Sequence, residues 1–105
     1  MSDARFDEVV HAPHRLRIAA LLAAVGGQVE FRTIRETLDV ADSVVSKHVK
    51  VLQDAGYVDV LKPTGLGRAR TWVQLTAAGR RAYAEHVAAL REIVERPADA
   101  DADAP

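Results

Sequence analysis

The sequence has 105 residues, of which 49% are hydrophobic and 28% charged, the proportions of an ordinary soluble domain. It contains no cysteine, which excludes a disulfide framework and a metal site built on thiolates. No apolar run approaches the roughly 20 residues that span a bilayer. The polar, acidic residues 1–8 lack the apolar core of a signal peptide, so we expect a cytoplasmic protein that does not enter a membrane.

The formal net charge is only −1, but the charges are unevenly distributed. Residues 43–75 carry five basic and two acidic side chains, whereas the segments before and after them are both net acidic. A locally basic segment can face the phosphates of nucleic acid. Charge alone, however, favours an ordinary solvated surface. The positions of the basic residues in the predicted helices and strands have to distinguish this alternative from a nucleic-acid surface.

The first predicted elements are two helices separated by a proline. Phe6, Val9 and Val10 lie at helical spacing in a short N-terminal helix. Pro13 breaks that helix and is well placed as the first residue of the next. The second helix presents an apolar face over residues 16–25, and the glycine pair that follows ends it.

The central elements are two short helices joined by a tight connection. Residues 28–31 predict a short extended segment, and a helix is expected over residues 32–38. After three connecting residues, a further helix is predicted over 42–55, and Gly56 ends it. Its apolar residues recur at spacings of four and three and predict one buried face: Val45, Val49 and Leu52.

A hairpin and a last helix complete the predicted domain. Strands are expected over 57–62 and 68–75, because the five residues between them are rich in proline and glycine. Thr76 can cap a last helix over 77–95. Residues 1–96 then form one domain. The remaining nine residues, 97–105, contain only alanine, aspartate and proline, and a disordered acidic tail is expected there.

Two short helices joined by a tight turn and followed by a hairpin form a winged helix-turn-helix. In residues 11–18, 38–58 and 67–80, the chain resembles small winged-helix regulators of the bacterial ArsR and MarR families. The resemblance implies a mostly α-helical fold with a small β-hairpin wing (α+β). It also implies a dimeric, sequence-specific regulator of double-stranded DNA, most simply a repressor. No cofactor is predicted, and a small-molecule effector is possible but is not identified by the sequence.

The helix over 42–55 is the predicted reading helix, because the major groove of B-DNA admits one α-helix. Residues near the N-terminus of such a helix usually reach base edges, and later cations reach phosphates. Lys50 is accordingly assigned to a phosphate, and Val44 is a candidate for contact with a thymine methyl group. The full set assigned to base edges is Ser43, Val44, Ser46 and Lys47.

The hairpin and the preceding helix supply the other predicted DNA contacts. Arg68 and Arg70 are two residues apart and share one face of their strand. With Lys62 across the hairpin, they are expected to contact the DNA backbone or enter the minor groove. In the resembling families the first helix of the helix-turn-helix lies across the DNA backbone, which implies phosphate contacts for Arg32 and Thr33.

One residue departs from the resembling families. Many of their members have serine or threonine at the position of Ala41, where the hydroxyl caps the reading helix. Alanine cannot accept those amide hydrogens, a loss of about 1 kcal/mol. Asp42 or Ser43 are alternative caps, and either would move the start of the helix and the register of the base contacts.

The last helix also predicts a homodimer. The helix comes after the residues that complete the predicted winged helix-turn-helix, and its apolar stripe has the spacing of a two-heptad seam. The apolar residues of the N-terminal helix could pack against this stripe. The alternative is that the helix packs only on its own domain. The residues predicted at the dimer interface are Phe6, Val9, Val10, Tyr83, Val87, Leu90 and Val94.

The sequence gives no support for metal or enzymatic chemistry. His11, His14, His48 and His86 do not form a ligand cluster with metal-binding spacing, so no metal site is predicted. A phosphate-binding loop and a nucleophile with a base at useful spacing are also missing. The competing hypothesis is a winged-helix module that binds protein and not DNA, and its main support is the slight net negative charge.

Overall fold

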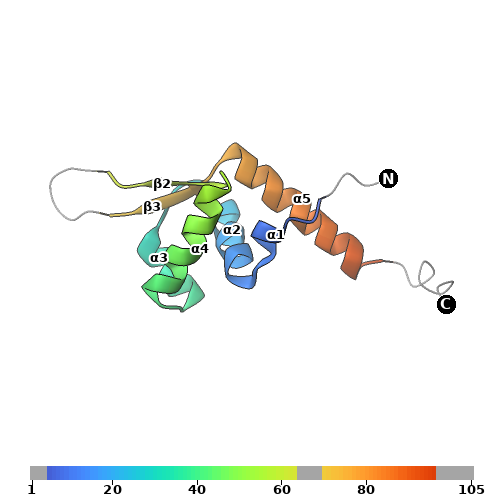
Figure 1. Ribbon diagram of the computed structural model, residues 1–105, viewed down its shortest axis with the longest axis horizontal. Coiled ribbons are helices and arrows are strands. Elements are labelled where there is room, and N and C mark those ends of the chain that lie inside the picture. The colour runs from blue at the N-terminus through green and yellow to red at the C-terminus, as the bar shows by residue number, and fades with distance from the viewer. Residues whose placement is uncertain (1–4, 64–69, 97–105) are drawn as a thin grey trace.

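The computed structural model describes residues 5–63 and 70–96. In these two stretches, helices and strands follow one another in the predicted order (Figure 1). The mostly helical fold with a small sheet is therefore confirmed. The elements are α1 (Glu8–His11), α2 (Pro13–Val25), β1 (Val29–Glu30), α3 (Phe31–Leu38), α4 (Asp42–Asp54), β2 (Val58–Leu61), β3 (Trp72–Leu75) and α5 (Ala77–Val94).

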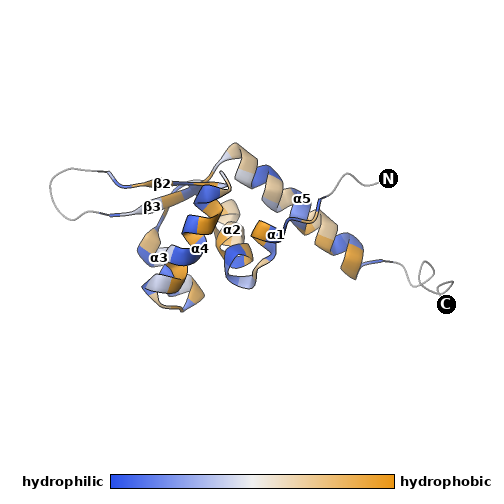
Figure 2. Ribbon diagram, viewed as in Figure 1, coloured by the Kyte–Doolittle hydropathy of each residue, from blue (hydrophilic) through white to orange (hydrophobic). Residues whose placement is uncertain are grey.

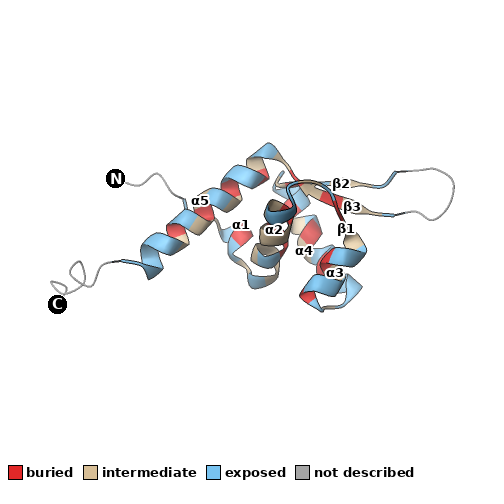
Figure 3. Cartoon of the chain, turned by 180° about the vertical axis from the view of Figure 1, so that it is seen from behind, coloured by how far each residue is buried: buried red, intermediate tan, exposed pale blue. Residues whose placement is uncertain are grey.

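The core lies where α2, α3 and α4 meet one face of the sheet. α3 and α4 are amphipathic, with their apolar residues toward the core, whereas α2 is apolar all round after Arg17 (Figures 2 and 3). The predicted stripe of α4 is buried, as are the residues that it meets. The largest fully buried members of this cluster are Ile18, Leu22, Ile34, Val45, Leu52 and Val73.

The sheet is antiparallel, with β3 between β1 and β2. Val73 pairs with Val29 on one side and with Val60 on the other. Both hairpin strands are shorter than predicted, because pairing between them ends where Leu61 meets Trp72. Part of the predicted second strand and most of the predicted turn lie outside the described residues.

The helix termini correct three sequence predictions. Phe6 lies before α1, because Asp7 is extended and its carboxylate accepts hydrogen bonds from the first amides of that helix. Phe31 is the first residue of α3 and not the end of the preceding strand. Val25 shares a face with Leu22 but is 56% exposed, since it is the last residue of α2.

α5 begins with the predicted cap and is held closely against the end of α4. The Thr76 hydroxyl accepts a hydrogen bond from the Gly79 amide at 2.9 Å and donates one to the carbonyl of Gly56 at 2.7 Å. Gly79 is required by this approach, because a Cβ there would lie 2.0 Å from the carbonyl oxygen of Tyr57. From this junction α5 extends away from the hairpin (Figure 1). None of the described helices is long and apolar enough to span a bilayer.

Candidate nucleic-acid interface

The reading helix predicted from the sequence is α4, and it presents two different faces. Its inner face is anchored by the buried Val45, Val49 and Leu52. Successive residues of a helix are rotated by about 100° about its axis, which places a set of exposed polar side chains on the side opposite this inner face. That set is Ser43, Lys47, Lys50 and Asp54. Ser46 is also exposed, on the flank toward the hairpin, whereas Val44 is half-buried on the other flank.

The N-terminus of α4 begins without a side-chain cap. Ala41 is the N-cap residue in an extended conformation, and its carbonyl accepts hydrogen bonds from the amides of Val44 and Val45. The suggestion that Asp42 or Ser43 replaces Ala41 as the cap is therefore wrong. Because the helix begins at Asp42, the register used to assign the base contacts does not shift.

Two arginines that the sequence reasoning did not select hold the turn between α3 and α4. Arg35 Nε lies 2.8 Å from Asp42 Oδ1 and so joins α3 to the first residue of α4. Arg17 of α2 donates hydrogen bonds to the carbonyls of Thr37 and Leu38 at 3.3 and 3.4 Å, at the C-terminus of α3. No local spacing indicates these contacts, because each joins different elements.

The side of α4 that faces α2 carries a histidine. His48 Nδ1 lies 3.1 Å from Arg15, and the ring of His14 is 5.2 Å from that of His48 between centroids. A guanidinium only donates, so Nδ1 of His48 is the acceptor. Burial lowers the pKa of His48, and the positive charge of Arg15 lowers it further, with smaller effects from His14 and Lys47.

Three of the predicted DNA-contact residues line one groove between α4 and the hairpin. This groove has a volume of about 330 Å³ and brings Ser46 and Lys50 of α4 together with Lys62, which follows β2. Gln53 and Thr71, which the sequence reasoning did not select, line the same groove. It therefore joins the exposed face of the helix to the base of the hairpin.

The remaining predicted contacts are distributed around this groove. Arg70 is exposed, and its Nε lies 3.9 Å from Glu30 Oε2, on the β1 side of the hairpin and away from the groove. Arg32 and Thr33 are both exposed in the first turn of α3. Arg68 lies outside the described residues.

Comparison with known proteins identifies this arrangement. Residues 14–94 match the family model described as a winged helix DNA-binding domain. The chain belongs to this family. The winged-helix chain is also 32% identical to an uncharacterised protein of Methanocaldococcus jannaschii over 73 residues, which cover 70% of this chain and 78% of that one.

Solved structures give the same result. A transcriptional regulator homologue from Pyrococcus horikoshii superimposes with a TM-score of 0.78 and 25% identity, covering 85% of this chain and 87% of that one. A possible transcriptional regulator for arsenical resistance superimposes with a TM-score of 0.60 and 28% identity, covering 82% of this chain and 80% of that one. NadR, solved in complex with 4-hydroxyphenylacetate, superimposes with a TM-score of 0.68 and 26% identity, covering 84% of this chain and 61% of that one.

These similarities confirm the resemblance to winged-helix regulators that the sequence indicated. The winged-helix chain is a DNA-binding regulator, and its family and fold are those of transcription regulators, not of enzymes. Among the described residues, no three histidine, aspartate or glutamate side chains gather closely enough to hold a metal ion.

The residues predicted at the dimer interface differ in accessibility. Phe6 and Val94 are exposed, by 42% and 79%. Val9, Tyr83, Val87 and Leu90 are half-buried, whereas Val10 is fully buried. Ile93, which was not predicted at the interface, is 63% exposed beside this stripe.

Proposed function

We propose that this protein is a dimeric transcriptional repressor that reads a pseudo-palindromic operator. In this proposal α4 enters the major groove, and the wing, residues 57–75, contacts the DNA backbone or the minor groove. In this proposal residues 1–96 act as one DNA-binding domain in the cytoplasm and repress by covering a promoter. An effector, if one acts, changes the separation of the two reading helices.

The exposed face of α4 is the observation that carries the proposal. Ser43 and Lys47 point away from a rigidly packed inner face and lie in the N-terminal half of the helix, the part that reaches base edges in helix-turn-helix proteins. Ser46 faces the groove shared with the wing. Val44 is half-buried, so any contact with a thymine methyl group uses only the edge of its side chain.

Cations for phosphate contacts surround this face. Lys50 and Lys62 line opposite walls of one groove, which favours contacts to the backbone on either side of the major groove. Arg32 and Thr33 are exposed at the start of α3, and Arg70 is exposed on the wing. The ion pair of Arg70 with Glu30 is long and open to solvent, so it competes little with a phosphate.

The proposed dimer uses the far end of α5. Three of the four large exposed hydrophobic residues in the described chain belong to this region: Phe6, Ile93 and Val94. Large exposed apolar side chains that gather in one place mark association surfaces. Pairing two copies here would direct the two reading helices to the same side of a duplex, about 34 Å apart on successive major grooves.

A gel shift with the DNA upstream of the gene, at two salt concentrations, tests the proposal. If the dimer neutralises about six phosphates, log K falls with log[salt] with a slope near −5, and a change from 50 to 200 mM weakens binding about 1,000-fold. A response that is flat in salt, or no shift at all, would favour a winged-helix module that binds protein.

Two variants separate the proposed roles on the DNA. Lys47→Ala should reduce binding to the operator much more than binding to unrelated DNA, because its partner is a base edge. Arg70→Ala should reduce both, since its partner is a phosphate. Arg80→Ala is the matched control, as Arg80 is exposed on α5, away from the proposed interface, and should change neither. Equal losses from the first two variants would contradict the assigned roles.

A further inference from the structure

The structure places all four histidines of the chain in two pairs that join different elements. His11 of α1 meets His86 of α5, with Nδ1 and Nε2 3.1 Å apart. His14 of α2 meets His48 of α4 through ring contact. The first pair also holds the segment that precedes α1, and the DNA-binding surface makes no use of it.

The contacts of His86 fix where its proton lies. Its side chain is fully buried, and its Nδ1 is 2.9 Å from the backbone nitrogen of Asp7. A backbone amide can only donate, so Nδ1 accepts and carries no proton. The neutral ring of His86 must therefore carry its proton on Nε2 and donate it to His11 Nδ1. Each ring in this arrangement is neutral, because a proton added to either one faces another N–H group.

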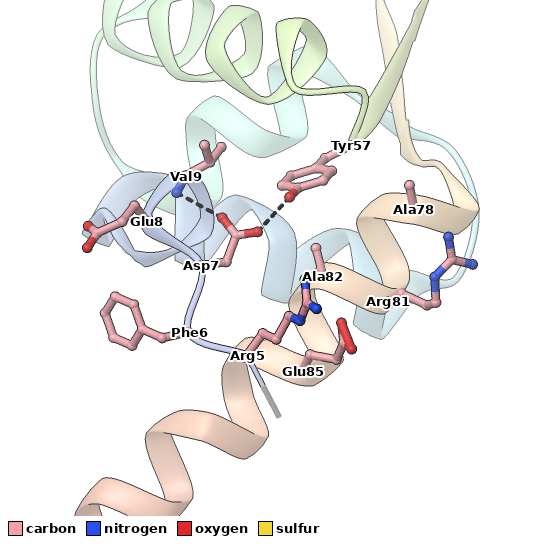
Figure 4. A pocket seen from close by; sticks show the side chains of 10 residues that line it. All are labelled: Arg5, Phe6, Asp7, Glu8, Val9, Tyr57, Ala78, Arg81, Ala82 and Glu85. Atoms are coloured by element: carbon pink, nitrogen blue, oxygen red, sulfur yellow. Dashed lines mark hydrogen bonds between the residues drawn. The ribbon is translucent and has the colours of Figure 1, made fainter. Parts of the chain in front are cut away.

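This pair holds residues 5–7, which we name the strap, across α5. Phe6 packs against both imidazoles, with ring centroids 4.5 Å from His11 and 4.7 Å from His86. Asp7 caps α1 with one carboxylate oxygen and accepts a hydrogen bond from the Tyr57 hydroxyl, at 2.5 Å, with the other. Figure 4 shows Asp7 between α1 and Tyr57, above α5.

We propose that the strap is a proton-controlled latch, which is closed over α5 when His11 and His86 are neutral and released when the pair takes up a proton. A proton on His86 Nδ1 would face the Asp7 amide and break that hydrogen bond. A proton on His11 Nδ1 would face the Nε2–H of His86 and break the other. In both cases Phe6 loses the rings against which it packs.

The charged groups around the pair have opposing effects on the pKa of His86, and burial decides the direction of the shift. Burial lowers the pKa of His86 most, and His11 lowers it further, whereas the carboxylates of Asp7 on the strap and Glu8 on α1 raise it by less. Tyr57, which lies between α4 and β2, stays protonated, because its hydrogen bond to Asp7 raises its pKa. Arg5 of the strap and the α5 side chains of Arg81 and Glu85 are the other charged groups around the adjoining pocket.

The sign of the pH dependence follows from this direction. The unfolded histidine, with an ordinary pKa of 6.5, takes up a proton more readily than His86 does in the closed strap. The latch is therefore fully stabilised above about pH 6.5 and is lost as the pH falls through the lower pKa of the folded state. Release would expose the face of α5 that Phe6 covers, next to Ala89 and Ile93.

Nuclear magnetic resonance of the full chain between about pH 7.5 and pH 5 tests the latch. At the higher pH, His86 should show the tautomer with its proton on Nε2. On acidification its ring should become doubly protonated as the Asp7 amide loses protection from hydrogen exchange, about tenfold per pH unit. The amides of Ile34 and Leu52, in the core, should stay protected, which separates release of the strap from unfolding.

Variants assign the transition to one histidine pair. His86→Gln keeps a side-chain acceptor and a donor but cannot titrate, so its Asp7 amide should stay protected down to pH 5. His48→Gln alters the other pair and its contact with Arg15 but leaves His11 and His86 in place, so it is the matched control and should retain the transition. The latch is wrong if the wild-type Asp7 amide stays protected at pH 5, if His86 has the other tautomer, or if His86→Gln keeps the transition. None of these readouts depends on DNA, so a failure of the latch can be distinguished from a failure of the proposed DNA binding.

Discussion

Gly79→Ala tests how tightly α5 is joined to the end of α4. The new Cβ would lie 2.0 Å from the carbonyl oxygen of Tyr57, whereas real Cβ atoms essentially never come closer than 3.0 Å to a neighbour. Both partners are fixed to the backbone, so no side chain can rotate away. The start of α5 must therefore move by about 1 Å relative to Tyr57.

A displacement of that size acts on the hydrogen bonds that define the junction. Thr76 donates its amide to the Tyr57 carbonyl at 3.0 Å and its hydroxyl to the Gly56 carbonyl at 2.7 Å, and it accepts from the amide of residue 79 at 2.9 Å. Overpacking costs about 1–3 kcal/mol, and loss of the N-cap about 1 kcal/mol more. We expect the free energy of unfolding to fall by about 2–4 kcal/mol, and Tm by roughly 10–25 °C.

Urea and thermal unfolding followed by circular dichroism would measure this loss. Gly27→Ala is the matched control, because its Cβ would meet nothing within 4 Å and its φ is not in the left-handed region. The control should remain within about 0.5 kcal/mol of the wild type. If Gly79→Ala is no less stable than Gly27→Ala, the close approach of α5 to Tyr57 is not a feature of the folded protein.

Two further substitutions probe the two ends of the reading helix. Ala41→Ser should raise the free energy of unfolding by about 0.5–2 kcal/mol, because the N-cap position is extended and has no side-chain acceptor; unchanged stability in urea would contradict the missing cap. Asp54→Asn should strengthen binding to unrelated DNA by a factor of up to about 5, since it frees Lys50 from an exposed ion pair worth about 0.2–1 kcal/mol; a filter-binding titration that shows weaker binding would contradict a phosphate role for Lys50.

The features that were predictable from the sequence are those that depend on neighbours along the chain. The apolar spacing of Val45, Val49 and Leu52 predicted both the position of α4 and its buried face. The same holds for Thr76, whose hydroxyl accepts from an amide only three residues away. Such patterns also predicted the order of elements, because each helix and strand carries its own periodicity and its own end signals.

The features that escaped prediction depend on residues that only the fold brings together. Asp7 meets Tyr57 and His86, 50 and 79 positions away, and nothing in the local sequence distinguishes it from other acidic residues. The requirement for glycine at position 79 is similar, since the backbone that excludes a Cβ belongs to Tyr57. The lengths of the hairpin strands also depend on pairing between distant residues, since β2 and β3 are paired only from Val58–Leu75 to Leu61–Trp72.

The missing cap of α4 and the two unpredicted arginines have a common explanation. A helix that begins at Ala41 without a side-chain acceptor is held less firmly at its N-terminus, which is the end proposed to contact base edges. Arg35 compensates by contacting the first residue of that helix at 2.8 Å, and Arg17 holds the carbonyls at the end of α3. The Arg35–Asp42 pair is exposed, so it contributes little to stability. What it adds is a link between α3 and the first residue of α4, at the turn from which the proposed reading helix projects.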